Sequence, residues 1–228
     1  SVTTYDAFAS AREEIRLMEQ RALPRIVSAL ACAFNERDRY VTLRKVARTT
    51  AGGLLDGTTI HDVRLEFKGE LSTSSAIDQD SLQTKLKTAA LLAPSLNERV
   101  AKFLALGQSE EDQMKRFLYF FFALEIETHA AFQRLDHGKG LAVLLSESAA
   151  TSPTQALLRA QLSGLRNLYD RFVWCAVCAW SHLTAEDTVL FKQLKQARDD
   201  IAHGNASDPP AGYAMLAERL AIRVLSPG

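Results

Sequence analysis

Apolar side chains recur every three to four residues along most of this chain, and that period predicts amphipathic helices. The predicted helices cover residues 5–22, 23–35, 81–93, 97–106, 112–135, 154–183, 185–202 and 213–225. The second would start around Pro24, because proline is accepted in the first turn of a helix. We therefore expect a mainly α-helical protein, with an N-terminal helical region over residues 1–80 and a helical domain over residues 81–228.

Residues 61–71 follow a different pattern, in which apolar and charged side chains alternate as in a half-buried β-strand. A lone strand is not stable. The pattern is therefore compatible with one small β-hairpin in the N-terminal region, in which the partner is either residues 40–46 or Leu54 and Leu55.

The predicted helix 112–135 is apolar on nearly all sides, which is typical of a helix buried at the centre of a bundle. Ser109, followed by three acidic residues, resembles a helix start. Glu125 interrupts the apolar run and would be costly to bury without a partner. His129, four residues on, is one candidate partner; alternatively, Glu125 lines a functional cleft and supports the site there.

The predicted helix 185–202 ends in the densest polar cluster of the chain. Thr184 or Ala185 opens it, and Gly204 follows His203 as expected after a helix end. Its last turns contain the run Arg-Asp-Asp-Ile-Ala-His, residues 198–203. In the simplest interpretation these are solvated charges, with a histidine placed favourably at the negative end of the helix dipole.

Helical geometry limits what this cluster can do. Residues five apart on a helix project about 140° from each other, so Arg198 and His203 do not share a face. Asp199 and His203 are four apart and do share one, so the carboxylate could orient the imidazole. A site that needs both Arg198 and His203 therefore requires a distorted helix end or a second copy of the chain.

Composition and charge limit which kinds of partner and which location the sequence is compatible with. The 228 residues are 47% hydrophobic and 24% charged, with 27 basic and 27 acidic side chains, so no whole-molecule field attracts nucleic acid. A local patch would suffice, and one basic cluster is either such a patch or a solvated face: Arg37, Arg39, Arg44, Lys45 and Arg48. No apolar run reaches the roughly 20 residues of a membrane span, and the polar N-terminus lacks a signal-peptide pattern.

Cysteine usage indicates a reducing compartment, and we expect the cytoplasm. Three cysteines in a chain of this length do not form a disulfide framework. Cys175 and Cys178 have the C-x2-C spacing, but they lie inside an apolar helix, and a zinc site needs four ligands. We interpret them as core residues and expect neither a metal site nor a cofactor.

The residues Arg198, Asp199 and His203, in the order R-D-D-I-A-H, resemble the motif of the HEPN superfamily, an arginine followed by a polar residue and then by a histidine. The segment KRFLYFFFALEIETHAAF, residues 115–132 with Leu124-Glu125 inside it, is similar to the long second helix of large HEPN proteins from prokaryotic conflict systems. The resemblance covers residues 81–225. Asn205 departs from those toxin members that carry a tyrosine two residues after the histidine.

The resemblance implies an all-α homodimer whose two motifs face each other across a cleft, and a metal-independent endoribonuclease. His203 would be the general base or acid, Arg198 would hold the phosphate, and Asp199 and Glu125 would support them. The implied partners are RNA or a nucleotide, an antitoxin or another regulatory protein, and no membrane. Two alternatives stay open: a non-catalytic nucleotide-binding or dimerisation module, and a helical scaffold with a charged helix end.

Overall fold

The structure is a computed structural model that describes residues 4–35, 50–53, 57, 59–62, 78–147, 151–165 and 167–226. These residues are mainly helical, as the hydrophobic pattern predicts. They form two compact units, Ser1–Ser95 and Leu96–Gly228. The units divide beyond the boundary at residue 80 drawn from the sequence, because the helix α2 (Gln79–Leu92) packs against α1 (Thr4–Phe34).

The N-terminal unit is built on α1, which is one helix through Pro24 rather than two. An interior proline removes one main-chain hydrogen bond and weakens a helix, but α1 continues on both sides of Pro24. A hairpin is present, but its strands are β1 (Thr50–Gly53) and β2 (Thr59–Asp62), paired antiparallel. Its proposed partners, residues 40–46 and Leu54-Leu55, and the rest of the predicted strand, residues 63–71, lie outside the described residues.

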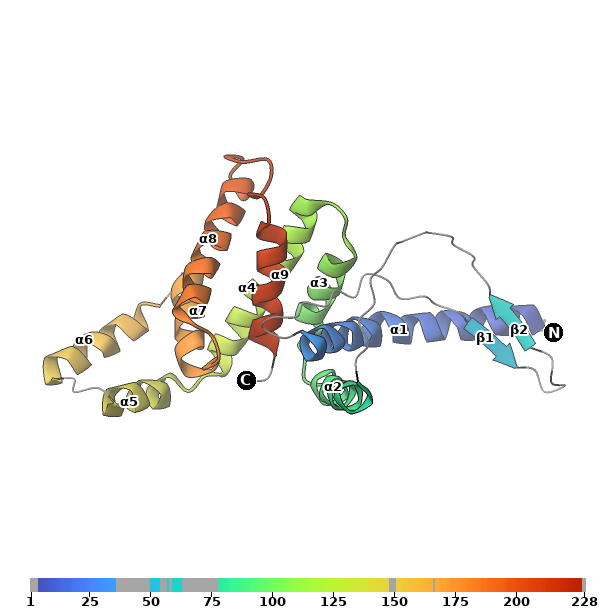
Figure 1. Cartoon of the computed structure of the whole chain (residues 1–228), viewed down its shortest axis with the longest axis horizontal. Helices are drawn as coiled ribbons and strands as arrows, with labels where there is room; N and C mark the ends of the chain where they lie inside the picture. Colours follow the sequence, from blue (N-terminus) through green and yellow to red (C-terminus); the bar gives the residue numbers. More distant parts are fainter. Residues whose placement is uncertain are drawn as a thin grey trace. The chain divides into compact units, whose positions relative to one another are not determined.

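The C-terminal unit is a helical bundle around α4 (Gln113–Arg134), which contacts α3 (Glu98–Ser109), α7 (Leu168–Cys178), α8 (Ala185–Ala202) and α9 (Tyr213–Leu225). Figure 1 shows α4 running behind α7, α8 and α9. Helices α5 (His137–Glu147) and α6 (Ser152–Ser163) extend away from this bundle. The prediction of a central buried helix is confirmed.

Aromatic side chains fill the centre of the bundle. Phe121 of α4 stacks on Phe191 of α8, with ring centroids 5.9 Å apart, and Phe191 stacks on Phe172 of α7 at 3.8 Å. All three rings are fully buried. Stacked aromatic pairs add about 0.5–1.5 kcal/mol each to the free energy gained from burying their surface. This column joins α4, α7 and the first half of α8.

The capping residue predicted for the central helix and the single helix predicted over residues 154–183 are wrong. The side chain of Asp112, not Ser109, caps α4 by accepting the Lys115 N–H at 2.8 Å, because Ser109 still belongs to α3. The long helix predicted over 154–183 is two helices, since α6 ends at Gly164 and Asn167 caps α7. Glycine is common where a helix ends, and asparagine is favoured at the position that caps the start of the next helix.

None of the helices among the described residues is both long enough and apolar enough to span a membrane.

Candidate functional site at the end of helix α8

Helix α8 begins and ends where the sequence predicts. The main-chain N–H of Thr184 donates to the carboxylate of Asp187 at 2.9 Å, and the same carboxylate pairs with Arg223 of α9. Gly204 follows the last turn with a φ of 74°, a left-handed conformation that glycine adopts without strain. The charged end of α8 is therefore attached to a firmly anchored helix.

Arg198 is held by three groups. Its terminal nitrogens lie 3.3 Å from Glu125 Oε1 on α4 and 2.9 Å from Asp199 Oδ1, and its guanidinium lies 5.1 Å from the centre of the Phe121 ring. Its Nε is buried and meets no hydrogen-bond acceptor within the described part of the chain. The side chain as a whole is still 24% exposed, so part of it is in contact with solvent.

The carboxylate of Asp199 has other partners than the one expected. It accepts from Lys195 at 2.6 Å as well as from Arg198, whereas His203 reaches Asp199 through the main chain, His203 N–H to Asp199 C=O at 2.9 Å. Lys195 precedes Asp199 by the same four residues that separate Asp199 from His203. A cation is the stronger partner for a carboxylate, which explains why the lysine takes it.

Glu125 pairs with Arg198 and not with His129. The imidazole of His129 instead accepts a hydrogen bond at its Nδ1 from Arg171 of α7, at 3.0 Å. The contact of Glu125 with Arg198 joins the two segments that carry the HEPN resemblance.

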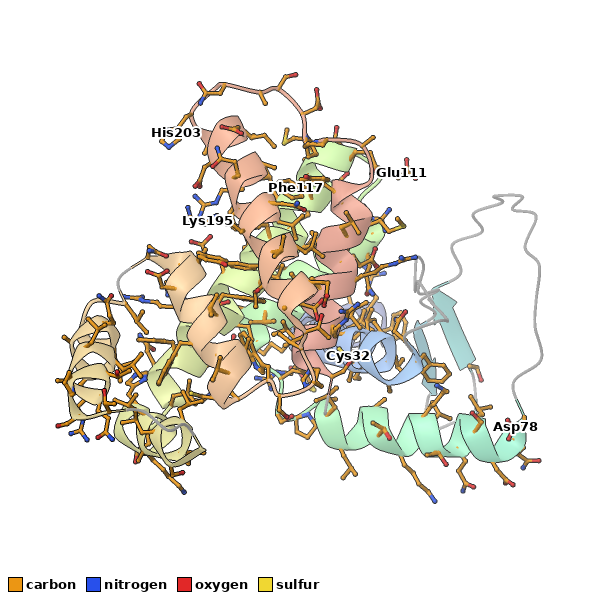
Figure 2. All side chains as sticks on the ribbon, turned by 60° about the vertical axis from the view of Figure 1, so that its left-hand side comes forward. Cys32, Asp78, Glu111, Phe117, Lys195 and His203 are labelled. Atoms are coloured by element: carbon orange, nitrogen blue, oxygen red, sulfur yellow. The ribbon has the colours of Figure 1, made fainter. Side chains whose placement is uncertain are left out.

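His203 lies at the exposed end of α8, and Figure 2 shows it near the turn that follows the helix. Among the described residues its side chain does not contact Arg198. The structure therefore joins the side chains of Arg198, Asp199 and Glu125 by ion pairs that do not include the His203 side chain. The angle of about 140° on the helix separates His203 from Arg198.

The charges around Arg198 cancel locally. Arg198 and Lys195 are positive, and Glu125 and Asp199 are negative. A phosphate that approaches Arg198 gains two donors but also meets two carboxylates. Phosphate binding there is favourable only with further positive charge, which a protonated histidine can supply.

The cysteine pair, a second candidate site in the sequence, has the surroundings of core residues. Cys175 and Cys178 are free thiols, and burial, with smaller contributions from Cys178 and Glu127, raises the pKa of Cys175 to about 12. Such a thiol is unreactive at neutral pH, in agreement with a core role. Among the described residues, no three His, Cys, Asp or Glu side chains gather closely enough to hold a metal ion. The basic cluster at 37–48 lies outside the described residues.

The sequence reasoning missed Phe121 and Lys195 as neighbours of Arg198. Lys195 had a local signal, its spacing of four residues from Asp199. Phe121 had none, because its contact with Arg198 joins two helices that lie far apart in the chain.

Comparison of the chain with protein-family models, curated proteins and solved structures gives no significant match.

Proposed function

We propose that the protein is a metal-independent endoribonuclease of the HEPN type that acts as a homodimer in the cytoplasm, in a defence or toxin–antitoxin system. The observation that supports this proposal is the end of α8, where Arg198 is held beside Glu125 and His203 is exposed to solvent. Arg198 and His203 thus lie at the same end of α8, where the arginine is held by ion pairs and the histidine is exposed.

In the proposed reaction the ribose 2′-hydroxyl attacks the adjacent phosphorus, and the bond to the 5′-oxygen of the next nucleotide breaks. His203 accepts the proton of the 2′-hydroxyl, and a histidine also returns a proton to the departing 5′-oxygen. Histidine suits this role because it changes charge near neutral pH. Arg198 neutralises the phosphate through its planar donors. The products are a 2′,3′-cyclic phosphate and a free 5′-hydroxyl.

A second copy completes the site in this proposal. Because Arg198 and His203 project about 140° apart on one helix, one phosphate cannot contact both in the same chain. Two α8 ends that face each other would place the His203 of each chain near the Arg198 of the other.

Incubation of the full chain with end-labelled single-stranded RNA in EDTA tests the proposal. We expect cleavage that persists in EDTA, yields cyclic-phosphate ends and spares DNA, which lacks the 2′-hydroxyl. His203→Ala and Arg198→Ala should abolish cleavage. The controls Asn205→Ala, next to the motif, and Arg159→Ala, on the exposed side of α6, should retain it. Loss of cleavage in EDTA, or full activity of His203→Ala, contradicts the proposal.

One observation favours the alternative of a non-catalytic nucleotide-binding or dimerisation module. Both terminal nitrogens of Arg198 already contact carboxylates, which is the arrangement of an arginine that holds helices together. If this alternative holds, no RNA is cleaved, and nucleotide binding measured by calorimetry is weakened by Arg198→Ala but unaffected by His203→Ala.

A further inference from the structure

The middle of helix α1 has little cover from the rest of the N-terminal unit. Residues 9–22 are exposed, apart from Glu19, which is half-buried. Before this stretch the half-buried Phe8 ring lies against Gly52 of the hairpin, and after it the buried part of α1 begins at Val27. Figure 1 shows the hairpin and α2 near opposite ends of α1. About four turns of helix between them are therefore open to solvent.

An apolar seam runs along this exposed stretch. It consists of Ala11, Ile15, Met18 and Ala22, which all project within about 60° of one another on the helix. Ile15 is 44% exposed and Met18 is 65% exposed, so two large apolar side chains lie in water on the same side. Spacings that alternate between three and four residues form the heptad pattern with which two helices pack together. We call these residues the α1 seam.

Charged residues flank the α1 seam on both sides. Glu14 and Arg21 lie on one side, and Arg12 and Glu19 lie on the other, each about 70–90° from the middle of the seam. Each side therefore carries one acid and one base. In a pair of helices these flanking positions meet across the seam, and their charges decide which partner binds and in which direction it runs.

A second copy of α1 matches the seam when it runs in the opposite direction. Ile15 of each copy then lies opposite Met18 of the other, and Ala11 lies opposite Ala22. The arrangement is two-fold symmetric, because every contact occurs twice. Such a pair covers the two large apolar side chains that α1 alone exposes to water.

The flanking charges favour this antiparallel pair over a parallel one. In the antiparallel pair Glu14 lies beside Arg21 of the other copy, and Arg12 lies beside Glu19, in each case within about 3 Å along the axis. Every one of these contacts joins opposite charges. In a parallel pair Glu14 would instead meet Glu19 of the other copy, twice in each dimer, and like charges repel.

We propose that the α1 seam binds a second copy of this chain as an antiparallel helix pair. The observation that identifies the occupant is the charge order beside the seam, which is complementary to its own reversed copy. The contact lies in the N-terminal unit, outside residues 81–225, and it does not rest on the proposed function. So short a seam buries little surface, and we therefore expect a reversible dimer.

Sedimentation equilibrium of the full chain over a range of concentrations, at low ionic strength, gives the dissociation constant. Met18→Glu places a carboxylate inside the seam twice in each dimer and should weaken the dimer at least about ten-fold. Leu17→Glu is the matched control, because Leu17 is 52% exposed but projects about 130° from the middle of the seam. This control should dimerise like the wild type.

Charge reversal tests the direction of the pair. Glu14→Arg sets arginine against arginine, and Arg21→Glu sets glutamate against glutamate, so each variant alone should weaken the dimer about five-fold or more. Mixing the two variants should restore association, because in the mixed pair each reversed charge meets an opposite one. A chain that carries both substitutions should also dimerise like the wild type.

Cysteine cross-linking detects this contact separately from any contact through α8. When Ala11→Cys and Ala22→Cys chains are mixed and oxidised, the two new thiols lie opposite each other and should form a disulfide. Neither variant should cross-link alone, because the same residue in the two copies lies about 16 Å apart along the axis, beyond the reach of a disulfide. The wild-type chain gives the background from the native cysteines.

The inference is overturned if the full chain stays monomeric, if Met18→Glu changes neither self-association nor cross-linking, or if Glu14→Arg strengthens the dimer, which would indicate a parallel pair. Binding of a monomeric chain to phosphatidylcholine vesicles, lost in Met18→Glu, would assign the seam to a lipid surface instead. The proposed function fails separately, if RNA stays uncleaved in EDTA while the α1 helices cross-link as expected.

Discussion

Helix α4 forms two arginine–glutamate ion pairs with other helices, and the two pairs have similar contacts but differ in their exposure to solvent. Arg116 of α4 binds Glu218 of α9, and Arg198 of α8 binds Glu125 of α4. In each pair the guanidinium also lies over a phenylalanine ring of α4, at 5.7 and 5.1 Å from the ring centres. The first pair is closed, with side chains 14% and 0% exposed, whereas the second is 24% and 28% exposed.

The difference separates a structural ion pair from an accessible one. Glu218 is enclosed by the bundle, and one of its oxygens has no hydrogen-bond partner among the described residues. Arg198 and Glu125 remain in contact with solvent, and the exposed His203 follows on the same helix. The same chemical pair therefore ties α9 to α4 in one place, and in the other it joins α8 to α4 where solvent reaches both side chains.

The largest effect should come from breaking the closed pair. Glu218→Ala leaves the largely buried Arg116 without its counter-ion and should lower the free energy of unfolding by about 3–5 kcal/mol. Glu125→Ala breaks the more exposed pair with Arg198 and should lower the free energy of unfolding by less than about 1 kcal/mol. Both tryptophans, Trp174 and Trp180, lie in the C-terminal unit, so their fluorescence during urea denaturation reports on that unit. Equal losses in the two variants would remove the distinction between the pairs.

A second effect should come from the ring beneath the closed pair. A Cβ atom at Gly107 of α3 would lie 2.6 Å from the Phe120 ring, so Gly107→Ala overpacks the contact that supports Arg116. We expect a loss of about 1–3 kcal/mol in the same denaturation experiment. Gly138→Ala on α5 is the matched control, because its nearest neighbour, an Asp136 oxygen, is 3.5 Å away. A stable Gly107→Ala variant would show that α3 and α4 are less closely packed.

How much the sequence predicts depends on whether the signal is local. The bounds of α8 and α9 follow from caps and hydrophobic period, and both agree with the structure to within a residue or two. The partner of Glu125 was not predictable, because Arg198 lies 73 positions away in the chain. Helix α1 continues through Pro24, whereas α6 ends at Gly164. Proline and glycine therefore make a helix end more probable, but the rest of the fold decides whether the helix ends there.

Smaller changes in stability are expected at the accessible pair itself. Arg198→Ala and His203→Ala should each change the free energy of unfolding by less than about 1 kcal/mol, since both side chains keep contact with water. Their RNA cleavage should nevertheless be lost. A destabilisation of Arg198→Ala as large as that of Glu218→Ala, measured by tryptophan fluorescence, would assign Arg198 a structural role.

The smallest effect concerns a third pair, Glu127 with Arg134. Burial raises the pKa of Glu127 above its ordinary value, because Arg134 is 63% exposed and only partly offsets the desolvation. A carboxyl whose pKa is raised in the folded state adds stability below about pH 4.5, its unfolded value, and loses that contribution as the pH rises through the folded value. Glu127→Gln should therefore flatten the decrease in stability above pH 4.5, measured by urea denaturation at several pH values. An unchanged pH profile would show that burial does not dominate at Glu127.

Mixing two inactive variants tests the central claim most directly, namely that Arg198 of one chain acts with His203 of another. Arg198→Ala and His203→Ala are inactive alone in this account. If they are mixed and allowed to exchange subunits, half of the dimers are mixed and each has one intact site. The mixture should therefore recover about one quarter of the wild-type rate of RNA cleavage in EDTA. No recovery, in a mixture whose subunit exchange is verified by mass spectrometry, would contradict the shared site.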